Sequence, residues 1–159
     1  MMTVAILTIS DSAHQGKRVD ESGPALERRC QELNWKVVAA AVCADDKLAI
    51  SKQLSEWIDS AAASLILTSG GTGISERDNT PEATRAVLDR ELPGVSELIR
   101  ARGVAQTPFS VLSRGLAGTS RRSFVVNLPG SPKGALYSLN AIEQLIPHIV
   151  DLLSGKTEH

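Results

Sequence analysis

Residues 64–73 read Ser-Leu-Ile-Leu-Thr-Ser-Gly-Gly-Thr-Gly, a short apolar run that leads directly into a cluster of glycines. An uninterrupted apolar run of this kind is typical of a strand that is covered on both faces, as in parallel sheets. Glycines directly after such a strand let backbone N–H groups approach an anion closely. Because Thr80-Pro81 follows as a typical helix start, the stretch predicts a strand, an anion-binding turn and a helix. A tight turn that binds no ligand is the alternative.

Strand-like and helix-like segments alternate along the rest of the chain. Short apolar runs and apolar residues at a helical period identify most of them. Pro147 interrupts the last helical pattern and predicts a kink or break near Ile146. This alternation favours an α/β fold with a mostly parallel sheet. The predicted strands are 3–9, 35–42, 64–68 and 123–128. The predicted helical segments are 24–33, a helix after Asp46, a helix capped by Thr80, a stretch after Pro93, 110–118 and 139–153. The helix after Asp46 carries the apolar stripe Ile50, Leu54, Trp57, Ile58 and Ala61.

The composition indicates a soluble globular chain with one domain over residues 1–159. With 17 basic and 18 acidic residues and 3% aromatic residues, it has neither the charge excess nor the stacking surface expected of a nucleic-acid binder. No apolar run approaches the roughly 20 residues that span a bilayer, so no membrane association is expected. The N-terminus lacks the features of a signal peptide, and Cys30 and Cys43 form no CxxC pattern. We therefore expect a cytoplasmic protein with reduced thiols.

Polar residues follow each predicted strand at the point where it ends. Because ligands of parallel α/β folds bind beyond the carboxyl ends of the strands, these residues should meet at one rim of the sheet. Asp78, a few residues after the glycines, could hold Mg²⁺ against a bound phosphate, or could serve only as a turn residue. Asp45 and Asp46 follow another strand, and we expect one to reach the rim while the other caps the next helix. The converging segments are 10–11, 44–46, 69–78 and 127–133.

The loop after the last predicted strand carries a second set of polar groups. Asn127 offers an amide, Ser131 a hydroxyl, Lys133 a cation and Gly130 an accessible backbone. Such a set suits an anionic heterocycle, although an ordinary turn that ends a strand is the alternative. The loop that begins at Ser10 is polar as well, and is either a ligand loop or a solvated connection.

Three segments together resemble the molybdopterin adenylyltransferase family, the MogA/MoaB-like group to which the G domain of gephyrin also belongs. The similarity covers nearly the whole chain in the right order, and the second segment is the most specific one. The matching segments are Thr8-Ile9-Ser10-Asp11 with Asp20-Glu21-Ser22-Gly23-Pro24, then Leu67 to Gly73 with Arg77-Asp78-Asn79-Thr80-Pro81-Glu82-Ala83, and Asn127-Leu128-Pro129-Gly130-Ser131-Pro132-Lys133.

The resemblance implies a three-layer α/β/α sandwich and a step in molybdenum cofactor synthesis. In that family, molybdopterin and Mg-ATP are converted to adenylyl-molybdopterin and pyrophosphate, and the product passes to a molybdenum insertase. It also implies a homo-oligomer, a trimer or hexamer, with Asp78 and Asp45 serving metal binding and catalysis. A non-catalytic molybdopterin carrier and an oligomeric scaffold module of the same fold are the alternatives. The residues expected to contact substrates are Ser10, Asp11, Ser69, Gly70, Gly71, Thr72, Gly73, Asn127, Pro129, Gly130, Ser131 and Lys133.

Overall fold

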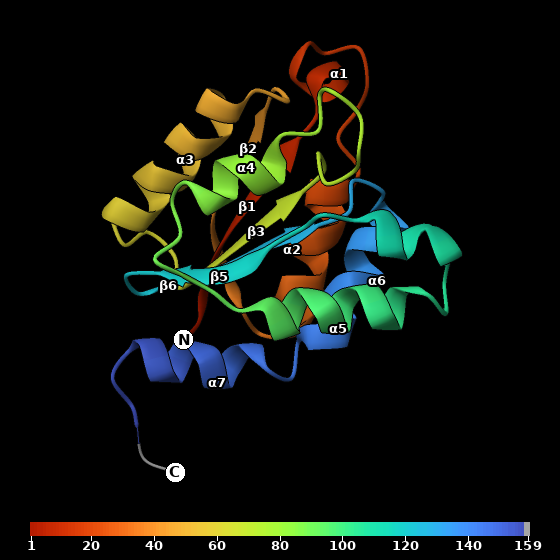
Figure 1. The fold of residues 1–159 in the computed structure, drawn as a ribbon. Helices are drawn as coiled ribbons and strands as arrows, with labels where there is room; N and C mark the ends of the chain where they lie inside the picture. Colours follow the sequence, from red (N-terminus) through yellow and green to blue (C-terminus); the bar gives the residue numbers. More distant parts are fainter. Residues whose placement is uncertain (158–159) are drawn as a thin grey trace.

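The strands of the chain form one six-stranded sheet in the order β2-β1-β3-β6-β5-β4, as the computed structural model shows for residues 1–157 (Figure 1). The four strands β2, β1, β3 and β6 are parallel, whereas β5 and β4 add an antiparallel edge. Every residue of β3 and β6 is buried, as the apolar runs predict. The strands are β1 (Thr3–Ile9), β2 (Lys36–Cys43), β3 (Leu65–Ser69), β4 (Arg90–Glu91), β5 (Ala117–Ser120) and β6 (Ser123–Leu128).

Helices cover both faces of the sheet and bury two separate apolar clusters. One face packs against α2 (Ser22–Glu32), α5 (Pro93–Gly103), α6 (Pro132–Ile142) and α7 (Ile146–Leu153). The other face packs against α3 (Lys47–Asp59) and α4 (Thr80–Arg85). The predicted three-layer α/β/α sandwich with a mostly parallel sheet is therefore confirmed.

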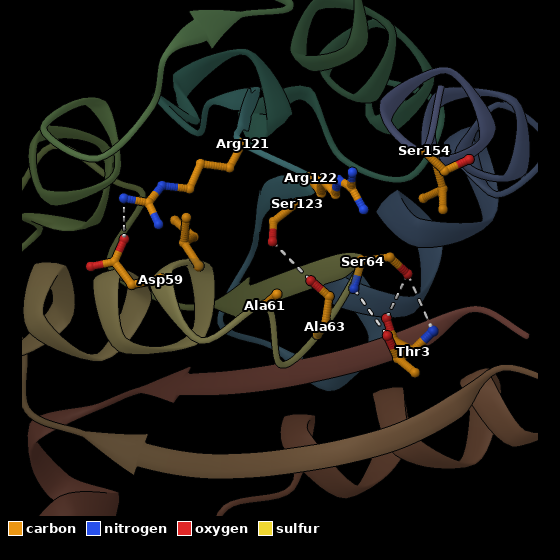
Figure 2. Close-up of a pocket in the computed structure, with 11 residues that line it drawn as sticks. Thr3, Asp59, Ala61, Ala63, Ser64, Arg121, Arg122, Ser123 and Ser154 are labelled. Carbon is orange, nitrogen blue, oxygen red and sulfur yellow. Dashed lines mark hydrogen bonds and ion pairs between the residues drawn. The ribbon is translucent and has the colours of Figure 1, made fainter. Parts of the chain in front are cut away.

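The two ends of the parallel strands have different surroundings. At the carboxyl end, the loops after β1, β2, β3 and β6 meet beside the short helix α1 (Asp11–His14), so the predicted convergence of these loops is confirmed, except for Asn127. At the amino end, α7 lies beside the start of the chain (Figure 1). A hollow lies at this end between α3, α7 and the turn from β5 to β6 (Figure 2).

The predicted helix over 110–118 is wrong. A 3₁₀ helix, η1, spans Pro108–Leu112, and β5 begins at Ala117. Antiparallel pairing with β6 determines this segment, because Ala117 lies opposite Val126 and Gly118 opposite Val125. Gly118 also approaches the edge strand closely, since a Cβ there would lie 2.4 Å from the Arg90 carbonyl oxygen.

Two smaller predictions are also wrong. Thr80 is the first residue of α4 rather than its cap, which is Asn79, and the Thr80 hydroxyl donates to the Gly70 carbonyl at 2.9 Å. Ala61 lies beyond the end of α3 with φ +52° and is exposed, so it is not part of the apolar stripe.

The break predicted at Pro147 is confirmed, because α6 ends at Ile142 and α7 begins at Ile146.

Both cysteines are free thiols, and burial raises the pKa of Cys30 to about 12 and that of Cys43 to about 11. Neither thiol is therefore suited to act as a nucleophile at neutral pH. Within residues 1–157, no helix combines the length and the apolar character needed to cross a membrane.

Leu54 tests the packing of α3 on the sheet. Its side chain is completely buried, so Leu54→Ala should lower the free energy of unfolding by about 2–5 kcal/mol through lost transfer energy and the cavity left behind. Urea denaturation measures this loss. The exposed Lys52 on the same helix provides the control, and Lys52→Ala should change the free energy by less than about 0.5 kcal/mol. Equal effects of the two substitutions would contradict the packing described here.

Asp46 tests the start of α3. Its Oδ2 accepts a hydrogen bond from the Ala49 amide at 2.8 Å, so Asp46→Ala should lower the free energy of unfolding by about 1 kcal/mol. Asp46→Asn should keep most of that free energy because asparagine is also a good N-cap. A denaturation midpoint that is the same in all three proteins would show that the cap contributes nothing.

Candidate functional site

The turn after β3 is built so tightly that only glycine fits at two positions. Gly70 has φ +106° and Gly71 has φ +67°, in the region that residues with a Cβ rarely adopt. A Cβ on Gly70 would lie 2.2 Å from the Ile9 carbonyl oxygen, and one on Gly71 would lie 3.1 Å from Asp45 Oδ1. The glycines therefore let this loop lie directly against the ends of β1 and β2.

The same loop offers backbone donors that the protein does not use. Its carbonyls are occupied: Gly71 O accepts from the Thr80 amide at 3.1 Å, and Thr72 O accepts from the Arg114 amide at 2.8 Å. The amides of Gly71, Thr72 and Gly73, in contrast, have no hydrogen-bond partner within residues 1–157. Consecutive free N–H groups in a turn with positive φ form a favourable place for an anion.

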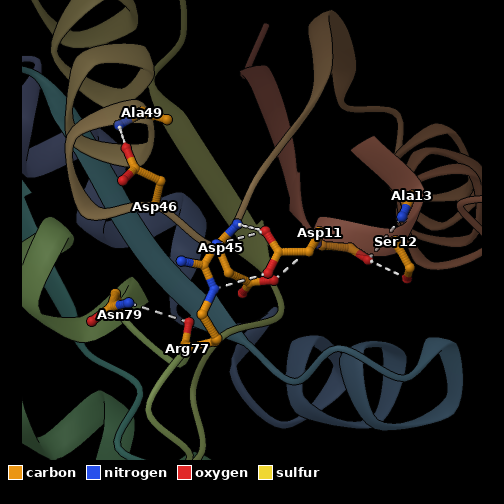
Figure 3. Close-up of polar contacts among 9 residues, drawn as sticks. Asp11, Ser12, Ala13, Asp45, Asp46, Ala49, Arg77 and Asn79 are labelled. Carbon is orange, nitrogen blue, oxygen red and sulfur yellow. Dashed lines mark hydrogen bonds and ion pairs between the residues drawn. The ribbon is translucent and has the colours of Figure 1, made fainter. Parts of the chain in front are cut away.

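Three acids, Asp11, Asp45 and Asp78, lie next to this turn. Asp11 and Asp45 hold each other reciprocally, because the Asp11 amide donates to Asp45 Oδ2 at 2.9 Å and the Asp45 amide donates to Asp11 Oδ1 at 3.0 Å. Arg77 binds both oxygens of Asp11, at 3.0 and 2.9 Å (Figure 3). This guanidinium lowers the pKa of Asp11, whereas burial raises the pKa of Asp45 and the charges of Asp11 and Asp78 raise it further.

Asp78 lies against the glycine turn. Its Oδ2 accepts from the Ser75 amide at 3.0 Å and from the Ser75 hydroxyl at 2.8 Å, and a Cβ on Gly73 would lie 2.7 Å from this oxygen. Asp45 and Asp78 thus share one neighbourhood beside the free amides. Asp46 points elsewhere and caps α3, as expected for one of the two adjacent acids.

The loop after β6 packs directly on the glycine turn. The Ser69 hydroxyl donates to the Pro129 carbonyl at 2.8 Å, the Gly70 amide donates to Leu128 O at 3.0 Å, and a Cβ on Gly130 would lie 3.3 Å from Gly70 Cα. Ser131 caps α6, with its Oγ accepting from the Gly134 amide at 3.0 Å. Lys133 follows in the first turn of α6 and is exposed.

Asn127 does not lie on the rim, contrary to the sequence-based expectation. It is 3% exposed, and its amide nitrogen donates to the hydroxyls of Thr68 and Thr84, both at 2.9 Å. Its oxygen accepts from the Leu116 amide at 3.0 Å. Every polar atom of this side chain is hydrogen-bonded inside the protein, so Asn127 supports the loop from the interior rather than contacting a ligand. Ser69 is occupied in a similar way by its bond to Pro129.

Two hollows open next to the converging loops. A cavity of about 340 Å³ lies between the glycine turn and the loop after β6. Phe109 and Leu112 of η1 form its third wall, which no sequence motif indicates. A polar hollow of about 60 Å³ lies on the other side of the loop after β6, where Ser10 and Arg18 line it. The residues of the two loops that line the larger cavity are Thr72, Gly73, Ile74, Pro129 and Ser131.

Arg114 is a further residue of the site that the sequence motifs do not indicate. Its Nε donates to the Gly73 carbonyl and its Nη2 to the Asp78 carbonyl, both at 2.8 Å, and its Nη1 pairs with Glu82. The guanidinium thus joins both ends of the segment from Gly73 to Asp78. It comes from the stretch wrongly predicted as a helix, and only the folded structure brings it to the loop.

Curated relatives of known name are similar over nearly the entire chain. The "Molybdopterin adenylyltransferase" of Helicobacter pylori strain J99 is 38% identical over 154 residues, which cover 96% of this chain and 88% of that protein. The "Molybdenum cofactor synthesis protein cinnamon" of Drosophila melanogaster is 41% identical over 154 residues. That match covers 96% of this chain but 26% of the Drosophila protein, so the chain spans about a quarter of its length.

Solved structures give the same result for the fold. The molybdopterin biosynthesis enzyme MoaB of Thermus thermophilus superposes with a TM-score of 0.92 at 46% identity, over 98% of both chains. The model of the family described as "Probable molybdopterin binding domain" matches residues 5–148. The resemblance seen in the sequence motifs is thereby confirmed: the chain belongs to the molybdopterin binding domain family.

Proposed function

We propose that this protein is a molybdopterin adenylyltransferase that joins the phosphate of molybdopterin to AMP from ATP and releases pyrophosphate. The observation that carries the proposal is the row of free amides from Gly71 to Gly73 beside Asp45 and Asp78. Free backbone donors suit phosphate groups, and carboxylates at this position suit a cation that accompanies them. Relatives named for this activity support the assignment.

The reaction needs two anions to be held in line. An oxygen of the pterin phosphate forms a bond to the α-phosphorus of ATP. The bond between that phosphorus and the oxygen that bridges it to the β-phosphorus breaks, and its electron pair leaves on pyrophosphate. Phosphoryl-type transfer depends mainly on positioning and on charge stabilisation. We assign the nucleotide phosphates to the amides of Gly71, Thr72 and Gly73. The loop 129–133, with Lys133 and the Ser131 hydroxyl, and the segment Ser10-Asp11 are assigned to molybdopterin.

The donor set at the rim fits Mg²⁺ bound together with a nucleotide. Within residues 1–157, no three side chains of the His, Cys, Asp or Glu type form a complete metal site. Mg²⁺ commonly binds through one or two carboxylates plus substrate phosphates, which matches Asp45 and Asp78. Burial is the main cause that raises the pKa of Asp45, and the negative charges of Asp11 and Asp78 raise it further. A cation bound here would offset the charge of these acids. When bound there, the ion would neutralise charge on the phosphates.

The proposal extends to the protein's context. The chain would act as one molybdopterin-binding domain over 1–159, assemble as a homo-trimer or hexamer, work in the cytoplasm and pass adenylyl-molybdopterin to a molybdenum insertase. The family model that matches residues 5–148 supports the single domain, and the other points follow from the resemblance to the adenylyltransferase family. Size measurement in solution tests the oligomer directly.

The reaction itself is the first test. Incubation of the protein with molybdopterin and Mg-ATP should release pyrophosphate and yield adenylylated pterin in equal amounts. A pyrophosphate assay measures the first product and mass spectrometry the second. Chelation of Mg²⁺ should weaken ATP binding in calorimetry and leave pterin binding in place. If the protein binds the pterin tightly but shows no ATP binding at millimolar concentration, the proposal fails in favour of a carrier.

Substitution of the two rim acids tests their roles. Asp78→Asn and Asp45→Asn should each lower turnover by about 10²-fold or more, the size typical of losing a preorganised electrostatic group. Both substitutions keep the shape of the side chain, so the thermal unfolding midpoint should change little. Asp46→Asn is the matched control, because it alters the adjacent acid, which caps α3 instead. Near wild-type turnover in either rim variant would remove that residue from the machinery.

A further inference from the structure

A cavity of about 430 Å³ lies at the end of the sheet opposite to the candidate site, and the proposed reaction does not use it. It opens where β1, β3 and β6 begin, between the ends of α3 and α7 (Figure 2). Its volume falls within the range of about 300–1,000 Å³ that is usual for small-molecule sites. Residues from several elements and turns line it, among them Thr3, Ile58, Ala63, Arg122, Ser123 and Val150.

Two consecutive arginines form the turn that closes this cavity. Arg121 and Arg122 are the whole connection between β5 and β6, and Arg121 has φ +51°. Two-residue hairpin turns normally use glycine or asparagine where φ is positive, because a longer side chain is disfavoured there. The turn is held by the Arg121 amide, which donates to Asp89 Oδ2 at 2.8 Å. An unfavourable backbone conformation that persists in this way is a reason to look for function nearby.

The fold already uses the three serine hydroxyls of the cavity as donors, while the Thr3 hydroxyl accepts from the Ser64 amide at 3.1 Å. The Ser123 hydroxyl donates to Ala63 O at 2.8 Å, the Ser64 hydroxyl to Thr3 O at 3.1 Å, and the Ser154 hydroxyl to Asp151 O at 2.8 Å. These contacts fix the floor of the cavity and leave little donor capacity for a ligand. The guanidinium groups are therefore the groups to consider.

Arg122 has no hydrogen bond or ion pair to any residue within 1–157, although its guanidinium lies at the cavity (Figure 2). Arg121 is only loosely held, since its Nη2 lies 3.3 Å from Asp59 Oδ1 and both side chains are more than 60% exposed. Exposed pairs of this kind contribute little and rearrange easily. A free guanidinium at a preformed cavity has the planar donor fork that a carboxylate or phosphate accepts in bidentate fashion.

The residues that line the cavity favour a carboxylate over a nucleotide or a phosphate. Ile58, Ala61, Ala63 and Val150 are aliphatic, and among the described residues the lining includes no aromatic side chain on which a nucleobase could stack. Two arginines and Asp59 give the lining a net charge of +1, which suits a single negative charge better than a phosphate dianion. A ligand with a carboxylate and an aliphatic body therefore matches both the charge and the walls.

We propose that this cavity binds a small aliphatic carboxylic acid, with its carboxylate on Arg122 and its hydrocarbon part against Ile58, Ala63 and Val150. The probe is 3-methylbutanoate, titrated into ¹⁵N-labelled full-length protein. The Nε–H signal of Arg122 and the amides of Ser64 and Ser123 should shift in a saturable manner, while amides of the glycine turn at Gly71 stay in place. Arg122→Gln should weaken binding at least about tenfold, as expected when a charge-assisted hydrogen bond is lost.

Three controls separate the outcomes. Arg28→Gln removes an exposed arginine on α2 and should leave the affinity unchanged. The neutral 3-methylbutanamide should bind at least about tenfold more weakly, because it lacks the charge. Inorganic phosphate should shift these signals less than the acid does. Tighter binding of phosphate would overturn the carboxylate assignment, and signals that do not move with the acid at millimolar concentration would overturn the site. Because binding alone is measured, the result is independent of the adenylyltransferase proposal.

Discussion

The close approach of backbone at Gly70 and Gly71 is the constraint on which the candidate site depends. Gly70 lies so near the Ile9 carbonyl that a Cβ would meet it at 2.2 Å, and a Cβ on Gly130 would lie 3.3 Å from Gly70 Cα. The loops after β1, β3 and β6 therefore touch through their main chains. This contact requires small residues at these positions.

The arrangement explains how a chain with a net charge of −1 can offer a place for two anionic substrates. The positive potential comes from amide groups whose carbonyls are engaged elsewhere, as with Thr72 O on the Arg114 amide. The three neighbouring acids would repel a phosphate on their own, and Arg77 offsets part of their charge through Asp11. Burial raises the pKa of Asp45, and the negative charges of Asp11 and Asp78 raise it further.

The parts of the molecule that can be predicted from the sequence are those determined by local pattern. The buried strands β3 and β6 and the glycines and acids at strand ends belong to this group. β5, in contrast, reads Ala-Gly-Thr-Ser without periodicity and becomes a strand because β6 pairs with it. Asn127 faces the interior because Thr68 and Thr84, 59 and 43 positions away, hold its amide nitrogen. The motifs do not indicate Arg114 for the same reason, since its partners lie more than 30 positions away, in the loop after β3 and in α4.

The two ends of the sheet offer different means of recognising an anion. At the carboxyl end, several backbone amides without partners in the described chain are concentrated in one turn, which suits a ligand that carries many acceptor oxygens. At the amino end, the Ser64 and Ser123 hydroxyls donate to the protein's own carbonyls, so the arginine side chains are the main groups that can meet a charge. The guanidinium of Arg122, which has no partner in the described part of the chain, favours one carboxylate together with the aliphatic walls. The strands that begin beside Arg122 and end beside Gly70 thus connect a site suited to a monoanion with one suited to polyphosphate.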